Sequence, residues 1–425
     1  MSTPLAQLQL DEDMLQGCMR CGFCLPACPT YKLRPIESAS PRGRIALMKA
    51  VQDGKLELAE IAPALDFCVG CQACEVVCPA GVEYGHLLFG TKQELEKIRP
   101  APRLVRFAYD HFLGKPLGIK LAAFGLWLYQ RSGLYRVARG LRISERIGGK
   151  GLADMEKSLP QAASPWRRWS RPTVTPAVGP RRLRIGFFAG CIQEIAFWET
   201  NQNAITVLAA AGCEVAVPPG QGCCGAVHSH SGDLAAAREQ ARRNIAVFEQ
   251  GGYDYIVNTA GGCGSELVEY GRTLADDPEW AERAKRFSAA CRDVSQVLAE
   301  LDPLPLGPLA ETITYQDSCH LRNVQRVSAP PRQLLKAVPG ARFVELPECD
   351  QCCGSGGTYS VAQAEASDRL LSRKMQNVVA TGATTVVVTN PGCQLEMIEG
   401  VQSAGLAGRV KVRHLVDVLA EALKK

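Results

Sequence analysis

Residues 18–29 have the sequence Cys18-Met-Arg-Cys21-Gly-Phe-Cys24-Leu-Pro-Ala-Cys28-Pro29. Residues 68–79 repeat its spacing of four cysteines and a proline, as Cys68-Val-Gly-Cys71-Gln-Ala-Cys74-Glu-Val-Val-Cys78-Pro79. This C-x2-C-x2-C-x3-C-P spacing is the one with which bacterial proteins hold pairs of 4Fe–4S clusters. A zinc site built from paired C-x2-C units would not explain the third cysteine or the proline. The two stretches therefore predict two iron–sulfur clusters.

The same spacing predicts which thiolates share a cluster. Three cysteines of one tight loop reach three irons of one cluster, whereas the fourth begins the exit from the loop and serves the other cluster. We therefore expect one 4Fe–4S cluster on Cys18, Cys21, Cys24 and Cys78, and the second on Cys68, Cys71, Cys74 and Cys28. This crossed ligation would hold the two clusters close together, as an electron relay requires.

The composition is that of an ordinary globular protein. The 425 residues are enough for two or three domains, with 46% hydrophobic and 21% charged residues. The net charge of +5 comes without a nucleic-acid-binding motif, so we expect no nucleic-acid partner. Residues 1–14 are polar and do not resemble a signal peptide, which predicts a reducing, cytoplasmic location. In such a location the clustered members of the 19 cysteines indicate metal binding and not disulfides. No apolar run is long enough to span a bilayer.

The segment between the two cysteine runs predicts helices rather than a β-hairpin. Ile45, Met48 and Val51 fall on one helical face. Ser40 is a suitable cap for that helix, and Pro41 suits its first turn. We therefore expect a helical ferredoxin domain with two clusters over residues 8–100.

Residues 101–182 are expected to form a basic helical segment and a linker. Residues 99–150 contain eleven Lys or Arg side chains against two acidic ones, with aromatic residues between them. This pattern suits the surface of a membrane or an acidic partner protein. Helices that pack on the molecule with a solvated basic side would show it too. Residues 160–180, rich in Pro, Ser, Arg and Trp, predict a strap between domains.

From residue 183 onward the pattern changes to alternating short apolar strands and amphipathic helices. Strands are expected at 184–189, 255–258 and 384–389, and helices at 233–250 and 362–381. This alternation predicts a parallel α/β domain. The fold class expected for the whole chain is therefore α+β multidomain, with a helical ferredoxin domain followed by a duplicated α/β domain.

The duplication is visible in a second set of cysteines. Each copy has a lone cysteine, then a Cys-Cys-Gly triplet 32 or 33 residues later, then a last cysteine 39 or 40 residues beyond. The first copy, over 183–310, contains Cys191, Cys223, Cys224 and Cys263; the second, over 311–425, contains Cys319, Cys352, Cys353 and Cys393. Ligands gather at the carboxyl ends of strands in such sheets, so we expect these loops of the two copies to face one another.

Grouped thiolates suit an iron–sulfur or zinc centre, so one hypothesis is a further metal site in the duplicated domain. The alternative hypothesis is that these cysteines are buried structural thiols that bind no metal. We assign Cys213 and Cys291, which lie outside the repeat, to the core, and Cys349 to no ligand role. The histidines at 228, 230 and 320 could be ligands or proton carriers, but simple loop residues are the favoured interpretation.

The order of these parts resembles the glycolate oxidase iron–sulfur subunit family over nearly the whole chain. The most specific pieces are the first cysteine run, Ser40-Pro-Arg-Gly-Arg44, Phe187-Phe-Ala-Gly-Cys191, Asp317-Ser-Cys-His320 and Cys352-Cys-Gly-Ser-Gly-Gly-Thr-Tyr359. The related heterodisulfide reductases carry a fifth cysteine per copy. Here Glu266 and Glu396 stand at that place, which counts against disulfide chemistry.

The resemblance implies a subunit that carries electrons and has no catalytic residue of its own. An FAD-binding partner subunit would oxidise glycolate or another 2-hydroxy acid, and this chain would pass the electrons to a quinone or another acceptor. Membrane contact, where present, would be peripheral, on the cytoplasmic face of the inner membrane. The alternatives are a disulfide-reducing catalytic subunit, a subunit of a glycerol-3-phosphate or lactate dehydrogenase, and a docking scaffold.

Crossed ligation makes a prediction that can be tested with single substitutions. Cys28→Ala should damage the cluster of the second run, and Cys78→Ala the cluster of the first, because each fourth cysteine serves the opposite loop. Iron content and electron paramagnetic resonance (EPR) spectra of the two variants measure this. Damage limited to the run that carries the substitution would contradict the crossing.

Overall fold

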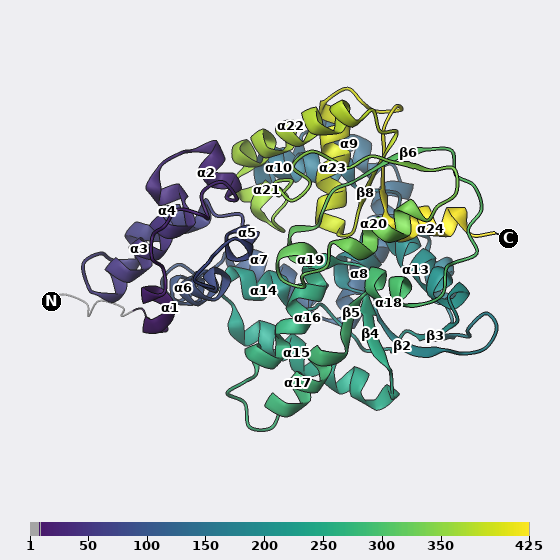
Figure 1. The fold of residues 1–425 in the computed structure, drawn as a ribbon, viewed down its shortest axis with the longest axis horizontal. Helices are drawn as coiled ribbons and strands as arrows, with labels where there is room; N and C mark the ends of the chain where they lie inside the picture. The colour runs from purple at the N-terminus through teal and green to yellow at the C-terminus, as the bar shows by residue number, and fades with distance from the viewer. Residues whose placement is uncertain (1–7, 9, 425) are drawn as a thin grey trace.

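The computed structural model describes residue 8 and residues 10–424, and these form three parts that pack together (Figure 1). The ferredoxin domain lies at the N-terminal end, drawn in purple. The duplicated domain forms the rest of the body, its first copy in teal and its second in green to yellow. The helical and α/β classes expected for the two ends are confirmed. Most of the polar stretch 1–14 that argues against a signal peptide lies outside the described residues.

The ferredoxin domain consists of short helices around a small apolar core. Its elements are α1 (Glu12–Gln16), α2 (Pro29–Leu33), η1 (Glu37–Ala39), α3 (Pro41–Gln52), α4 (Leu58–Asp66), α5 (Ala73–Val76) and α6 (Tyr84–Ile98). Helix α3 begins as expected, because the hydroxyl of Ser40 accepts a hydrogen bond from the amide of Gly43 at 2.9 Å. Ile45, Met48 and Val51 are buried on one side of this helix.

The basic segment is helical and runs along both copies of the duplicated domain. It contains α7 (Arg103–Ala108), the π-helix η2 (Tyr109–Leu113), α8 (Pro116–Arg131), α9 (Leu134–Gly140), α10 (Ile143–Ser158, interrupted at Gly148 and Gly149) and α11 (Pro165–Trp169). Helix α8 packs on the first copy and α10 on the second. The strap expected at 160–180 is more ordered than predicted, because it contains α11 and the edge strand β1 (Val174–Thr175).

The first copy, repeat 1 (183–310), is built on a five-stranded sheet of order β1-β3-β2-β4-β5. All pairs are parallel except β1 with β3. Its elements are β2 (Leu183–Phe188), α12 (Cys191–Ala196), α13 (Trp198–Ala210), β3 (Cys213–Ala216), α14 (Ala226–Ser231), α15 (Leu234–Phe248), η3 (Glu249–Gly251), β4 (Tyr255–Asn258), α16 (Gly261–Thr273), α17 (Ala281–Ala290), β5 (Cys291–Asp293) and α18 (Val294–Glu300).

The second copy, repeat 2 (311–425), has a fully parallel sheet of order β7-β6-β8-β9, which reproduces the order β3-β2-β4-β5 of repeat 1. Its elements are β6 (Thr312–Tyr315), α19 (Cys319–Asn323), α20 (Ala329–Lys336), β7 (Arg342–Phe343), α21 (Tyr359–Ala362), α22 (Ala364–Thr381), β8 (Thr385–Val388), α23 (Pro391–Ser403), β9 (Lys411–His414) and α24 (Leu415–Ala422). The predicted duplication is therefore present in the sheet topology as well as in the cysteines.

The two repeats share one core and meet at their strand ends. Phe187 and Val257 of repeat 1 and Tyr315 and Val387 of repeat 2 belong to a single buried cluster. The loops that follow β4 and β8 also contact each other: the amide of Gly261 donates to the carbonyl of Thr389, and the amide of Gly262 to Oδ1 of Asn390, both at 3.0 Å. The cysteine-bearing loops thus face one another as expected.

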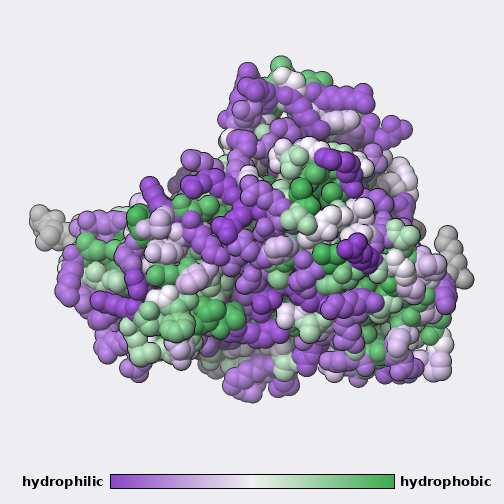
Figure 2. Space-filling model, turned by 45° about the horizontal axis from the view of Figure 1, so that its top comes forward, coloured by the Kyte–Doolittle hydropathy of each residue, from purple (hydrophilic) through white to green (hydrophobic). Residues whose placement is uncertain are grey.

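Apolar side chains reach the surface in several patches, some of which are visible as green areas in Figure 2. The basic segment contributes many of them. On α8, the buried Ile119 and Ala123 face the protein, whereas one stripe of the outer face is 44–68% exposed: Leu117, Leu121, Phe124 and Leu128. We call this stripe the α8 outer face. None of the helices that the structure describes is both long and apolar enough to cross a bilayer.

Glycine is required at one position near the start of α3. A Cβ atom at Gly43 would lie 1.8 Å from the carbonyl oxygen of Glu37, so the helix could not pack against η1. Alanine normally stabilises a helix interior by about 0.5–1 kcal/mol relative to glycine. We expect Gly43→Ala to destabilise the ferredoxin domain instead, by about 1–3 kcal/mol.

A matched control is available on α8. Gly125 lies inside that helix, and a Cβ atom added there would meet no neighbouring atom within 4 Å, so Gly125→Ala should be neutral or stabilising. Thermal unfolding of both variants measures the difference. Equal effects of the two substitutions would show that the contact with Glu37 does not matter.

Candidate metal centre

The two cysteine runs share an unusual backbone feature at two matched positions. The third and fifth residues of each run have positive φ angles: Arg20 and Gly22 in the first, Gly70 and Gln72 in the second. Such angles are uncommon for non-glycine residues such as Arg20 and Gln72. Two loops that share this costly conformation are built to present their thiols in the same way.

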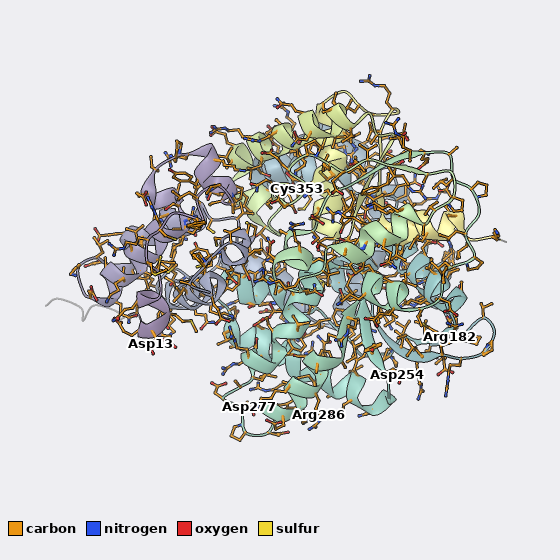
Figure 3. The ribbon with its side chains drawn as sticks, viewed as in Figure 1. Asp13, Arg182, Asp254, Asp277, Arg286 and Cys353 are labelled. Atoms are coloured by element: carbon orange, nitrogen blue, oxygen red, sulfur yellow. The ribbon has the colours of Figure 1, made fainter. Side chains whose placement is uncertain are left out.

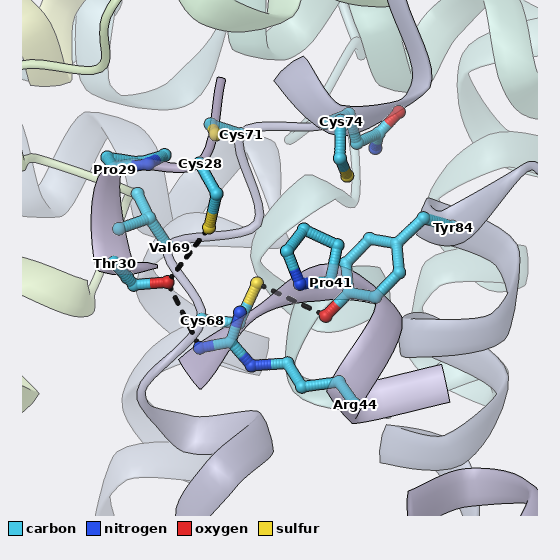
Figure 4. A pocket seen from close by; sticks show the side chains of 11 residues that line it. Cys28, Pro29, Thr30, Pro41, Arg44, Cys68, Val69, Cys71, Cys74 and Tyr84 are labelled. Carbon is cyan, nitrogen blue, oxygen red and sulfur yellow. Dashed lines mark hydrogen bonds between the residues drawn. The ribbon is translucent and has the colours of Figure 1, made fainter. Parts of the chain in front are cut away.

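The second cysteine set surrounds a small hollow in the ferredoxin domain (Figure 4). Cys68, Cys71 and Cys74 of the second run line it, and so does Cys28 of the first run. The space between the lining side chains amounts to about 280 Å³, counting the part open to solvent. The structure therefore brings together the four thiols that the crossed arrangement assigns to one cluster.

Three thiols of the first cysteine set pack against the helical core of the ferredoxin domain. Cys18, Cys24 and Cys78 are partly buried and pack against the core, whereas Cys21 is exposed. Burial raises the pKa of the Cys24 thiol, and the neighbouring Cys18 adds to this. The amide of Val82 donates a hydrogen bond to the sulfur of Cys78 at 3.4 Å. These four thiols remain the proposed ligands of the first cluster.

Hydrogen bonds to sulfur are concentrated at the second set. The hydroxyl of Tyr84 and the amide of Gly70 each lie 3.4 Å from the sulfur of Cys68 and donate to it. Thr30 Oγ1 lies 3.2 Å from the sulfur of Cys28. Burial raises the pKa of Cys71 and Cys74 well above the ordinary thiol value. Metal binding at this set therefore has to displace protons, and the donors favour the charged sulfur that results.

The thiols of the duplicated domain also converge. In repeat 1 the thiol of Cys191 donates to the sulfur of Cys223 at 3.5 Å, and the amide of Gly225 donates to the same sulfur at 3.4 Å. These two contacts, with one from Cys224, lower the pKa of Cys223. Cys263 packs against the same buried cluster.

Repeat 2 arranges its thiols in the same way, and Figure 3 shows Cys353 inside the molecule, away from the charged residues labelled at its edge. Cys319 and Cys352 interact through their side chains, as do Cys353 and Cys393, and all four pKa values are raised. In the part of the chain that the structure describes, no three His, Cys, Asp or Glu side chains are placed to hold a single metal ion. A cluster that brings its own sulfide ions requires a wider ring of thiolates than one ion does.

The second cysteine run packs closely against repeat 2. Val69 and Cys71 share one apolar cluster with Cys352 and Tyr359. Three hydrogen bonds cross this contact, since His320, Asn323 and Tyr359 bond the backbone carbonyl groups of residues 70, 71 and 67 at 3.1, 2.7 and 3.3 Å. The cysteines of repeat 1, in contrast, pack with Ile119 of α8. Repeat 2 is therefore the copy whose thiols adjoin the ferredoxin domain.

The other sequence candidates have structural roles. Cys213 and Cys291 are buried in the cores, as predicted, and Cys349 accepts a hydrogen bond from Arg332 at 3.4 Å. His228 pairs with Asp110 of the basic segment at 3.1 Å. The ring of His230 stacks on Phe89 at 4.6 Å. The histidines thus join the parts of the molecule.

Two groups at the sites were not assigned a role from the sequence. Arg44 lies in the hollow of the second set, although the sequence pointed only to its place on a helix. Glu266 and Glu396 stand three residues after the last cysteine of each repeat, and both are buried. Burial raises their pKa to about 8 and about 7, so at neutral pH Glu266 is mainly protonated and Glu396 is protonated in about half of the molecules. The sequence did contain a signal for the two glutamates, because each occupies the same position in its copy of the repeat.

Taken together, the loops, the hollow and the sulfur-directed donors define the class of this molecule as an iron–sulfur protein with a duplicated cysteine-rich domain. Family models agree: a 4Fe–4S dicluster domain matches residues 14–82, and a cysteine-rich domain matches residues 185–268 and 313–398. A third model, the linker region of the glycolate oxidase iron–sulfur subunit, matches residues 100–159.

Whole-chain relatives identify the particular family. A protein of Bacillus subtilis (strain 168), described as a probable glycolate oxidase iron–sulfur subunit, is 44% identical over 97% of this chain and 95% of its own length. The glycolate oxidase iron–sulfur subunit of Escherichia coli (strain K12) is 30% identical over the same shares. The chain belongs to the glycolate oxidase iron–sulfur subunit family.

Two further matches are a shorter relative and a solved structure. Lactate utilization protein A of Oceanobacillus iheyensis is 32% identical over 56% of this chain and 96% of its own length. The crystal structure of a hypothetical protein from Helicobacter pylori has a TM-score of 0.54 at 9% identity, covering 98% of this chain and 73% of that one. The latter is a likeness of fold.

The buried Glu266 predicts a pH dependence of stability. Its pKa is about 8 in the folded protein against 4.5 for the ordinary group, so the folded state binds the proton more tightly. Its contribution to the free energy of unfolding is therefore full below about pH 4.5 and is lost as the pH rises toward 8. Glu266→Gln, which cannot titrate, should flatten this decline.

The measurement is thermal unfolding of anaerobically prepared protein between about pH 5 and about pH 8.5. Glu282→Gln, on the exposed side of α17, is the matched control and should keep the wild-type slope. Parallel curves for wild type and Glu266→Gln would contradict a protonated Glu266.

Proposed function

We propose that this chain is the electron-transfer subunit of a glycolate dehydrogenase or a closely related 2-hydroxy acid dehydrogenase. Two relatives that match nearly the whole chain are described as glycolate oxidase iron–sulfur subunits, which supports glycolate as the substrate. The structural observation that best supports this proposal is the hollow lined by Cys28 together with Cys68, Cys71 and Cys74. Each 4Fe–4S cluster, when bound, would accept and release one electron at a time.

The proposed ligands are those of the crossed arrangement. The second set would hold its cluster in the hollow, with Tyr84 and Gly70 donating to the sulfur of Cys68. The first set, nearer the surface at Cys21, suits exchange of electrons with a partner protein. We further propose a redox centre on the thiols of repeat 2, because Cys352 packs against Cys71. Tight packing between two sites is what short-range electron transfer requires.

Oxidation of the hydroxy acid would take place on a separate FAD-binding subunit, and the electrons would leave to a quinone or another acceptor. We place the contact with partner subunits at the α8 outer face, where exposed Leu and Phe side chains lie among basic residues. A face with these side chains could bind an acidic surface of a partner protein, which is the first candidate. The second candidate is the surface of an anionic membrane. The cytoplasmic location stays a prediction.

Lactate remains the second candidate substrate. The specific observation is that lactate utilization protein A aligns over nearly its whole length to just over half of this chain. Comparison of glycolate and lactate as electron donors to the purified complex distinguishes the two. Disulfide reduction finds less support, because each repeat has a buried glutamate where a fifth cysteine would be needed.

The test is purification of the native complex with its partner subunits, followed by iron counting and glycolate-dependent reduction of an artificial acceptor. Cys352→Ser/Cys353→Ser should abolish most of this activity with the complex intact, because repeat 2 adjoins the ferredoxin domain. The matched control, Cys223→Ser/Cys224→Ser in repeat 1, should retain more activity. A complex that is iron-free and fully active would refute the proposed function, and equal activities of the two variants would refute the role of repeat 2.

A further inference from the structure

An arginine is completely buried beside the second cysteine set. Arg44 has 0% of its surface exposed, although arginine is among the residues least often buried. Its side chain extends from α3 into the hollow, beneath Cys28 and Cys68 (Figure 4). Burial of a charge at this place calls for a physical reason.

The hydrogen bonds of this guanidinium do not account for its charge. Its Nε donates to the carbonyl of Ala64 at 2.7 Å, and one terminal nitrogen donates to Thr30 Oγ1 at 3.1 Å. The other terminal nitrogen, Nη1, is buried and has no hydrogen-bond partner within the described residues. Over the same residues, Arg44 takes part in no ion pair with a carboxylate. The bonds that exist are to neutral groups, which an uncharged donor could serve equally well.

The groups that share the hollow with Arg44 include the sulfur atoms of Cys28 and Cys68, which would be negatively charged when they hold a cluster. Thr30 forms a bridge, because its hydroxyl contacts both the guanidinium and the sulfur of Cys28. A buried cation is stable only where it is paired, and here the available partner is the group that the thiols hold.

We propose that Arg44 is the buried counter-charge of the second cysteine set and raises the reduction potential of the cluster held there. The inference rests on the proposed function, which places a 4Fe–4S cluster on Cys28, Cys68, Cys71 and Cys74. Reduction adds one negative charge to that site. A fixed positive charge nearby, in surroundings of low dielectric constant, stabilises the reduced form more than the oxidised one. Arg44 is thus a positioning residue, and Nη1 is the donor left for the bound group.

The experiment compares Arg44→Gln with wild type in the complete complex. Iron per chain is counted first, and the potentials of the clusters are then measured by redox titration followed by EPR. In Arg44→Gln one of the two cluster potentials should become more negative. The equilibrium constant for its one-electron reduction should fall about tenfold, equal to about 59 mV.

Lys49→Gln provides the matched control. It removes the same charge from the same helix, but Lys49 lies on the outer face, where it pairs with Glu12 and Asp53 at 2.9 and 2.8 Å. This variant should leave both potentials unchanged. An Arg44→Gln protein that keeps its iron and both wild-type potentials would overturn the proposal, as would an equal shift in Lys49→Gln.

A third variant covers the case in which Arg44→Gln loses its iron. Arg44→Lys retains the positive charge without the planar guanidinium, so it should restore the iron and return the potential toward the wild-type value. If Arg44→Lys is as poor in iron as Arg44→Gln, the charge is not what the site needs and the proposal fails. Wild-type protein without reducible clusters would instead refute the proposed function itself, so the two failures can be told apart.

Discussion

Repulsion between sulfur atoms gathered in a buried space is the constraint on which the rest of this structure depends. Thiols packed this closely cannot all carry charge unless the protein supplies compensation. The ferredoxin domain supplies it with the hydroxyl of Tyr84, the amides of Gly70 and Val82, and the guanidinium of Arg44. The short helices and left-handed loop residues around them are the means by which a small core holds these donors in place.

The duplicated domain meets the same constraint differently. Its parallel sheets place the cysteine loops at the carboxyl ends of strands, and the shared core fixes the two sets relative to each other. The two cysteine sites differ in the parts of the molecule that pack against them. Cys352 of repeat 2 packs against the second cysteine run, whereas Cys223 of repeat 1 packs with Ile119 of the basic segment. The two copies of the cysteine site therefore lie in different environments.

Cysteine spacing and hydrophobic period predicted the fold well, because both are local signals. The helix at Pro41, the strands at 184–189, 255–258 and 384–389 and the repeat were all visible in the sequence. The edge strand β1 was not, because its two residues depend on pairing with β3, a distant segment. The place of Arg44 was hidden for a similar reason: an amphipathic pattern shows which residues face inward but not which thiols they meet.

The seal between Val69, Cys71, Cys352 and Tyr359 also has a consequence for the maturation of this protein. Cys71 lies within this contact, and Cys28 and Cys74 of the same set are buried as well. Docking of repeat 2 therefore narrows the access of iron and sulfide to this set. We expect loading of the cluster to be faster before the two domains close on each other than after.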